Sequence, residues 1–215
     1  MHAVAISVPG HRGRHCEDAS GVHSSGDTIV VADGLGSAAR GREAAQAAVH
    51  LVLGPLRRAL RAGLSPVHAP AFIHWLWRES PGDDAELKTT LLFAVRTPYY
   101  TVVGRVGDGL VLCPQRPDLL PSGRGSFGNS TDALPNQLVS VAVVPNDCTL
   151  LLASDGVSDD LKPGSEDALC SKLSELLATR GTADTTEQLS AWLTNWITPN
   201  SHDDRSLALL LGDTP

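Results

Sequence analysis

The sequence predicts an α+β fold in which antiparallel sheets are covered by helices, and two observations carry that prediction. Short apolar runs of strand length arrive mostly in consecutive groups, and helical patterning is confined to blocks between those groups. This order differs from the strict strand and helix alternation of a doubly wound parallel sheet. The chain of 215 residues, 42% of them hydrophobic, can bury a sizeable core, so we expect one globular domain spanning residues 1–215.

The expected strands are short runs rich in aliphatic and β-branched residues, and most of them end at Gly, Pro, Asp or Asn. They cover residues 3–8, 28–32, 89–95, 99–106, 109–113, 137–144, 148–153 and 206–211. Within this set, the stretch YYTVVGRVGDGLVLC predicts a hairpin that turns through Gly-Asp-Gly.

The clearest helix is expected over residues 38–62, where Ala, Gln, Leu and Arg recur at helical spacing until Gly63 and Pro66 end it. Further helices are expected over residues 67–79, 165–180 and 185–197. The Pro, Gly and Ser-rich stretch 114–135 predicts a long loop, and loops of that length often have a functional role.

Charge and composition exclude several classes of protein. A formal net charge of −7 argues against a general nucleic-acid binder and against binding to anionic membranes, because both usually need a basic field. No segment reaches the roughly 18 apolar residues of a membrane span, and the N-terminus lacks the pattern of a signal peptide. The four cysteines form no CxxC pair that would favour zinc. We expect a soluble, cytoplasmic monomer with reduced thiols.

Two buried-looking strands each run into an Asp-Gly pair. Asp33 follows the apolar run in the stretch TIVVADGLGS, and Asp155 follows the apolar run in the similar stretch TLLLASDGVSD. A single Asp-Gly is most simply a structural turn. A carboxylate at a strand end is nevertheless fixed by the sheet, and the glycine after it lets the backbone approach a ligand closely.

The combination of acidic positions predicts a metal site. If the strands bring Glu17, Asp33, Asp155 and Asp203 together, like charges about 4 Å apart repel by about 4 kcal/mol per pair at the effective dielectric of a protein surface. Two divalent cations would balance the four negative charges. Oxygen ligands favour Mg²⁺ or Mn²⁺, and a pair of such ions activates a shared water toward a phosphoryl group. The predicted activity is therefore hydrolysis of a phosphate ester.

Six motifs in order resemble the metal-dependent protein phosphatases of the PP2C (PPM) family. They are CEDAS, VVADGLG with the Ala-rich stretch after it, TTLL, VGDG, LLASDGVSDDL and DDRSLALLL, and the likeness covers residues 5–211. The stretch FGNSTDAL is similar to a small bacterial-type branch of that family. The resemblance implies a four-layer αββα sandwich and a Mn²⁺ or Mg²⁺-dependent serine/threonine protein phosphatase, which acts on phosphoproteins and opposes a partner kinase.

The resemblance also implies roles for individual residues. Asp33 would bridge two metal ions, and Glu17 and the carbonyl of Gly34 would complete one of them. Asp155 and Asp203 would complete the other.

Further positions match the family's motifs less directly. Asp203 is preferred to Asp204 because the family's ligand stands three residues before the Ser/Thr of the strand, here Ser206. Asp18 would orient metal-bound water and so act with Asp33 in catalysis. Asp108 and Asp159 match the positions of a third, weaker metal.

The sequence departs from the family pattern at three places, one of which is Ser37, where the second motif often has Gly. Gly13 occupies the position of the arginine that clamps substrate phosphate, which leaves Arg12 or Arg14 for that role. Leu35 stands where some members have a histidine. Metal-bound water, His11 or His15 would then protonate the leaving group.

Two other functions compete with this one. The first is a catalytically silent PP2C-like module that regulates or binds phosphoproteins, which the displaced arginine favours. The second uses a strand-end aspartate as a covalent phosphate acceptor. Dehalogenase-like enzymes of that kind need D-x-D, which both Asp33-Gly34-Leu35 and Asp155-Gly156-Val157 lack. An EF-hand in SDGVSDDLKPGSE fails because its glycine and acidic positions are misplaced.

Overall fold

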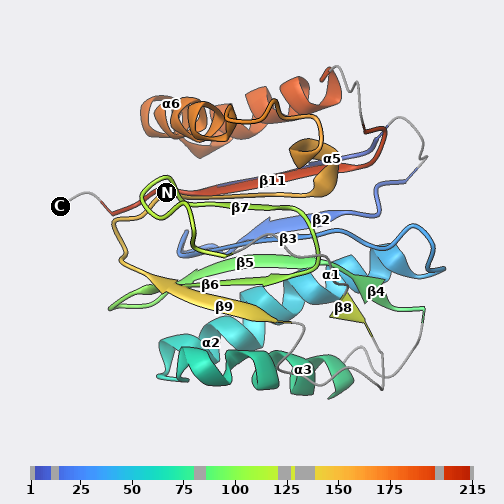
Figure 1. Ribbon diagram of the computed structural model, residues 1–215, viewed down its shortest axis with the longest axis vertical. Coiled ribbons are helices and arrows are strands. Elements are labelled where there is room, and N and C mark those ends of the chain that lie inside the picture. Colours follow the sequence, from blue (N-terminus) through green and yellow to red (C-terminus); the bar gives the residue numbers. More distant parts are fainter. Residues whose placement is uncertain are drawn as a thin grey trace.

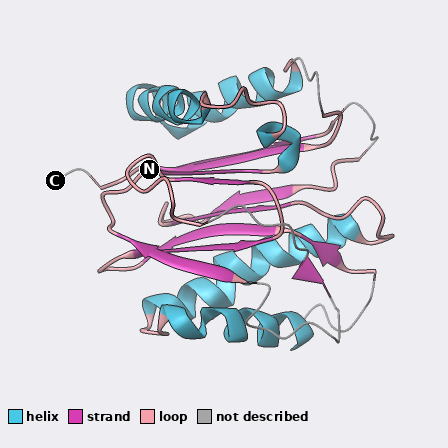
Figure 2. Cartoon of the chain, viewed as in Figure 1, coloured by secondary structure: helices cyan, strands magenta, loops and turns pink. Residues whose placement is uncertain are grey.

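Two antiparallel β-sheets lie face to face at the centre of the molecule, and helices cover the outer face of each (Figure 1). The computed structural model describes residues 3–10, 15–79, 86–120, 127–128, 139–196 and 201–213. Figure 2 shows the strands gathered between an upper and a lower helical layer. This arrangement confirms the predicted αββα sandwich.

The first sheet joins strands from both ends of the chain. Its order is β1 (Ala3–Val8), β11 (Arg205–Leu210), β10 (Leu150–Ala153) and β7 (Leu110–Leu112). The second sheet has the order β2 (Ala19–Val22), β3 (Thr28–Ala32), β5 (Leu91–Arg96), β6 (Thr101–Val106) and β9 (Ser140–Val144). A small third sheet pairs β4 (Lys88–Thr89) with β8 (Phe127–Gly128).

Helices from two parts of the chain form the outer layers. The layer on the second sheet contains α1 (Gly41–Leu51), the π-helical turn η1 (Val52–Leu56), α2 (Arg57–Arg61), the 3₁₀ turn η2 (Pro66–His68) and α3 (Ala69–Glu79). The short α5 (Asp155–Ser158) and the long α6 (Glu166–Thr194) lie on the side of the first sheet. No described helix has the length and apolarity needed to cross a membrane.

Alternation along the strands separates the core into three layers. In β3, Val30 and Ala32 pack toward the α1–α3 layer, whereas Ile29 and Val31 face the other sheet. In β11, Leu207 and Leu209 pack with α6, whereas Ala208 and Leu210 face the second sheet. Because both faces of these strands are covered, their sequences are continuously apolar, as the short apolar runs predicted.

The predicted hairpin through Gly107 and Gly109 is wrong. β6 pairs with β5 and β9 in the second sheet, whereas β7 pairs with β10 in the first. Both glycines have positive φ, 85° and 94°, and they turn the chain from one sheet to the other. A Gly-Asp-Gly between two apolar runs is typical of a hairpin, and only the partners of each strand reveal that it connects two sheets.

The helices differ from expectation mainly at their junctions. The helix expected over residues 38–62 begins at Gly41 and passes through η1, which contains Pro55. The two helices expected over residues 165–180 and 185–197 are present as the two arms of α6, which meet at Gly181, whose φ of 76° and ψ of −179° are not helical. Part of the loop expected over 114–135 forms β8, and residues 121–126 and 129–135 lie outside the described residues.

Candidate metal centre

Three chain segments that end or begin a buried strand meet at one edge of the two sheets, on the right in Figure 1. Asp33 directly follows β3, Asp155 begins α5 two residues after β10, and Asp203 precedes β11 by two residues. β10 and β11 pair directly, so their adjoining ends are neighbours. Aspartates that are far apart in the sequence therefore come close together.

The backbone of Asp33 is held on both sides. Its N–H donates to the hydroxyl of Thr90 at 3.1 Å, and its carbonyl accepts from the backbone N–H of Thr90 and from the hydroxyl of Thr89, both at 2.8 Å. Thr89 is fully buried. These bonds fix the end of β3 against the strands β4 and β5, and so fix the starting point of the Asp33 side chain.

Close packing explains the glycine after each of the two aspartates. A Cβ atom on Gly34 would lie 2.3 Å from the carbonyl oxygen of Gly41, at the start of α1. A Cβ atom on Gly156 would lie 2.0 Å from the carbonyl oxygen of Asp204. Neither contact can be relieved by moving a flexible side chain, since each involves backbone. The recurring Asp-Gly pair is therefore required for the strand ends to approach the neighbouring chain.

The pKa of Asp33 is raised far above its usual range. Burial is the largest cause, followed by the negative charges of Asp18 and Asp155 and, to a smaller degree, Asp203. The pKa of Asp155 is raised by burial and then by the charges of Asp108 and Asp203. Each carboxylate thus makes ionisation of its neighbours harder, which places these side chains in one electrostatic cluster.

Two of these side chains have buried oxygen atoms without partners. Asp18 is 7% exposed, and neither of its carboxylate oxygens has a hydrogen bond of ordinary geometry within the described part of the chain. Burial raises the pKa of Asp18. One carboxylate oxygen of Asp155 is likewise buried and unpartnered among the described residues. Such groups are costly to keep in a folded protein unless a cation or a proton compensates them.

Asp203 and Asp204 have different surroundings. Asp204 is buried, and its two carboxylate oxygens accept the backbone N–H groups of Gly10 at 2.6 Å and Glu17 at 2.5 Å. It therefore holds the two ends of the segment between β1 and β2. Asp203 is exposed, and one of its oxygens accepts the N–H of Asp204. Asp204 is committed to structure, whereas Asp203 contributes its charge to the acidic cluster.

The remaining predicted ligands surround this cluster less closely. Glu17 lies beside the loop after β3, since its Oε2 would be 3.2 Å from a Cβ atom on Gly36. Asp108 and Asp159 both contribute to the raised pKa of Asp155. Among the described residues, no three His, Cys, Asp or Glu side chains are arranged so that they could already hold a metal ion. The carboxylates are therefore electrostatic neighbours rather than a closed ligand shell.

The predicted phosphate-binding residues Arg12 and Arg14, together with His11, lie outside the described residues. The segment that carries them is flanked by Gly10 and Glu17, whose N–H groups both bind Asp204. His15 is described and exposed.

Sequence reasoning did not assign roles to several hydroxyl groups that support the site. Ser154 and Ser206 link the end of β10 to the start of β11, because each backbone N–H donates to the other residue, at 3.0 and 2.9 Å. Ser206 also donates from its hydroxyl to Ser7 at 2.6 Å, and Ser7 donates to Ser20 at 2.9 Å. The available clue was a serine within or directly after each of these largely apolar strands.

Comparison with known proteins gives a matching family model and several solved structures with the same fold. The family model described as protein phosphatase 2C matches residues 10–194. No curated protein matches the chain. Among solved structures, a bacterial serine phosphatase has 17% identity and a TM-score of 0.64, with 100% of each chain covered.

Two further solved structures share the fold. The serine/threonine phosphatase Stp1 from Staphylococcus aureus has 18% identity and a TM-score of 0.62, covering 100% of this chain and 96% of its own. The catalytic domain of the serine/threonine protein phosphatase PstP, solved with two manganese ions, has 18% identity and a TM-score of 0.55, with 96% of each chain covered. At these identities the likeness establishes the fold.

Proposed function

The chain belongs to the protein phosphatase 2C family, and we propose that it is a single-domain phosphoprotein phosphatase that hydrolyses phosphoserine and phosphothreonine with Mn²⁺ or Mg²⁺. The solved PstP complex with two manganese ions supports this choice of metal. We place the enzyme in the cytoplasm, opposite a serine/threonine kinase.

One observation carries the proposal. Carboxylates next to β2, next to β3 and at the start of α5 have raised pKa values, and buried oxygen atoms of Asp18 and Asp155 have no hydrogen bond of ordinary geometry among the described residues. The donor set consists of oxygen atoms, which suit hard divalent cations. Binding of cations would compensate the negative charge. The carboxylates, which do not form a ligand shell in the described part of the chain, would then coordinate the ions.

The proposed ligand assignment follows the match between this chain's motifs and those of the family. Asp33 would contribute to holding both ions, Glu17 and the carbonyl of Gly34 would help to hold one of them, and Asp155 and Asp203 would help to hold the other. The structural role of Asp204 supports Asp203 as the ligand, because both oxygens of Asp204 already accept backbone N–H groups. Asp108 and Asp159 border the cluster beside Asp155 and are proposed for a third ion.

Divalent ions held by these residues would supply activation of water for attack on phosphorus. The chain's own residues prepare this reaction. Asp18, buried beside Asp33, accepts a hydrogen bond from the attacking water and orients it. Arg12 or Arg14 binds the phosphate oxygens, for which a guanidinium is suited by its paired N–H donors. The serine or threonine oxygen then leaves with a proton from solvent or from a nearby histidine.

Hydrolysis of an aryl phosphate and of a phosphothreonine peptide tests the proposal. The metal-free chain should be inactive, and addition of Mn²⁺ should restore turnover of both substrates. Arg12→Gln and Arg14→Gln, made separately, identify the phosphate ligand by a raised KM. If both variants keep the activity of the wild type, the proposed role of these arginines in binding phosphate is wrong.

A catalytically silent, phosphoprotein-binding module is the competing function. It is favoured by Gly13 at the position of the family's arginine and by the open arrangement of the carboxylates in the described part of the chain. Such a module would bind a phosphopeptide but release no phosphate, even at millimolar Mn²⁺. Stoichiometric binding without turnover would therefore decide for the module.

A further inference from the structure

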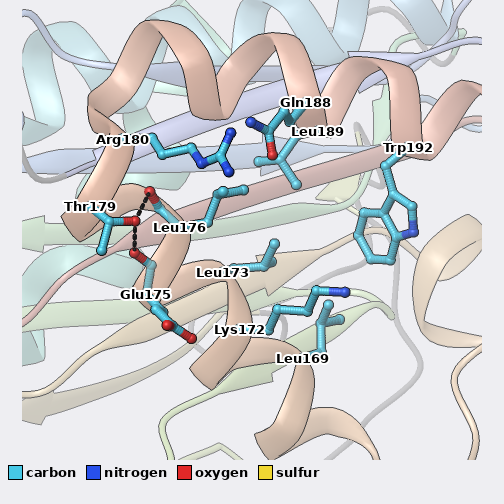
Figure 3. A pocket seen from close by; sticks show the side chains of 10 residues that line it. All are labelled: Leu169, Lys172, Leu173, Glu175, Leu176, Thr179, Arg180, Gln188, Leu189 and Trp192. Atoms are coloured by element: carbon cyan, nitrogen blue, oxygen red, sulfur yellow. Dashed lines mark hydrogen bonds between the residues drawn. The ribbon is translucent and has the colours of Figure 1, made fainter.

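The outer face of α6 contains a pocket that the proposed phosphatase activity does not use. The helix bends at Gly181, and the two arms enclose a pocket of about 410 Å³ (Figure 3). This volume falls within the roughly 300 to 1,000 Å³ that is typical of small-molecule sites. The acidic cluster lies at the edge of the two sheets, so the pocket is separate from it.

The pocket has an apolar floor. Leu173 and Leu189 are buried beneath it, and Leu176 is half-buried beside them. Trp192 closes the far end with 39% of its surface exposed, and its ring packs against Trp196 with centroids 4.5 Å apart. Exposed apolar surface of this kind, enclosed by two helix arms, favours an apolar ligand.

Each end of the pocket carries a basic side chain. Arg180 stands at the bend and extends toward Gln188 of the other arm, whereas Lys172 lies at the opposite end near Trp192 (Figure 3). Neither Arg180 nor Lys172 forms an ion pair with an acidic side chain in the described part of the chain. Glu175 is the acidic residue of the lining, and its carboxylate points away from Arg180 in Figure 3.

We propose that this pocket binds a small amphipathic carboxylate, such as a medium-chain fatty acid. Its carboxylate pairs with the Arg180 guanidinium and accepts a hydrogen bond from the Gln188 amide. Its apolar chain lies over Leu176 and Leu189 toward Trp192. The path from Arg180 to Leu169 spans about 11 residues of helix, about 16 Å at 1.5 Å per residue, which accommodates an extended chain of this size. The net charge of the protein is −7, yet Arg180 and Lys172 form no ion pair with an acidic side chain in the described part of the chain. These two positive charges beside an apolar floor favour an anionic ligand with an apolar part.

Titration of the ¹⁵N-labelled full chain with sodium decanoate, below its micelle concentration, tests the proposal through amide and indole chemical shifts. We expect saturable shifts confined to α6 and the indole N–H of Trp192. Decanol and decylamine should bind at least tenfold more weakly. Absence of saturation, equal binding of decanol, or shifts centred on another part of the fold would overturn the proposal.

Two variants identify the anion contact. Arg180→Gln should weaken decanoate binding about tenfold or more, and Arg180→Glu should reverse the preference toward decylamine. Arg58→Gln, which removes an exposed arginine on α2, is the matched control and should bind decanoate like the wild type. Unchanged affinity in Arg180→Gln, with its circular dichroism intact, would contradict the assignment. Phosphatase activity is not needed for any of these measurements.

Discussion

Asp33 and Asp155 are carboxyl groups whose pKa values are raised by burial and by neighbouring carboxylates. Asp33 and Asp155 should behave as ligands whose removal costs function but not folding. We expect Asp33→Asn and Asp155→Asn each to lower Mn²⁺-dependent turnover by at least about a hundredfold, because each removes an oxygen ligand from the site that activates water. Steady-state hydrolysis of an aryl phosphate measures this loss.

The same two substitutions should stabilise the metal-free fold. Asn removes a charge that raises the pKa of neighbouring carboxylates, so relief of repulsion should add about 1 kcal/mol or more to the free energy of unfolding in chelator. Urea unfolding measures the change. Asp184→Asn, at an exposed position of α6, is the matched control and should alter neither activity nor stability. Wild-type turnover in either site variant would rule out its ligand role.

Asp27 shows the opposite electrostatic situation. Burial opposes ionisation of its carboxylate, but hydrogen bonds from Arg57 Nε at 2.7 Å and Nη2 at 2.6 Å outweigh it and lower the pKa of Asp27 to about 2. Arg61 adds a further contact at 3.0 Å. This cluster ties α2 to the turn before β3.

A lowered pKa in the folded state stabilises the fold only while the carboxylate is ionised. The contribution of Asp27 is therefore fully present above its unfolded pKa of about 3.8 and is lost as the pH falls toward about 2. Asp27→Asn should cost roughly 1.5 to 3 kcal/mol at pH 7 and less at pH 2. Urea unfolding across this pH range tests it, and an equal cost at both pH values would show that the charge is not responsible.

At the scale of elements, the junction between α5 and β11 positions the site. Gly156→Ala would place a Cβ atom 2.0 Å from the carbonyl oxygen of Asp204, so either α5 or the start of β11 must move. We expect a loss of roughly 1 to 3 kcal/mol in stability together with a loss of turnover. Thermal unfolding and aryl phosphate hydrolysis measure both effects.

Gly54 in η1 provides the control for this substitution. A Cβ atom there would have only one contact, 3.9 Å from the Nη1 atom of Arg58, among the described residues. Gly54→Ala should therefore be neutral or stabilising by up to about 1 kcal/mol, with full activity. A similar effect of both substitutions would mean that close packing at Gly156 does not decide the geometry of the site.

At the scale of the whole molecule, local patterns predicted the layers better than the connections. Strands β3, β5, β10 and β11 are continuously apolar because both faces are covered, and this property is visible in the sequence. The Gly-Asp-Gly crossing at Asp108 was mistaken for a hairpin, because turn residues do not specify which sheet receives the next strand. The short pairing of β8 with β4 depends on contacts between distant residues and had no local pattern.

For the candidate site, too, local patterns in the sequence predicted some features, whereas features that depend on distant contacts were not predictable. The aspartates at strand ends could be identified from the sequence, because several acidic positions stand directly before or after apolar runs. Asp204 could not be separated from Asp203 by chemistry, because its role arises from two backbone N–H groups at Gly10 and Glu17, far away in the chain. The hydroxyl groups of Thr89 and Thr90 were also hidden, because their function is to hold the backbone of Asp33.

The central claim is that these carboxylates bind divalent cations. Equilibrium binding of Mn²⁺ is its most direct test. Isothermal titration calorimetry of the metal-free chain should show saturable uptake of two ions, and Asp33→Asn should lose the tighter of the two binding events. The control Asp184→Asn should titrate like the wild type. Absence of any saturable uptake at millimolar Mn²⁺, or unchanged uptake in Asp33→Asn, would contradict the account.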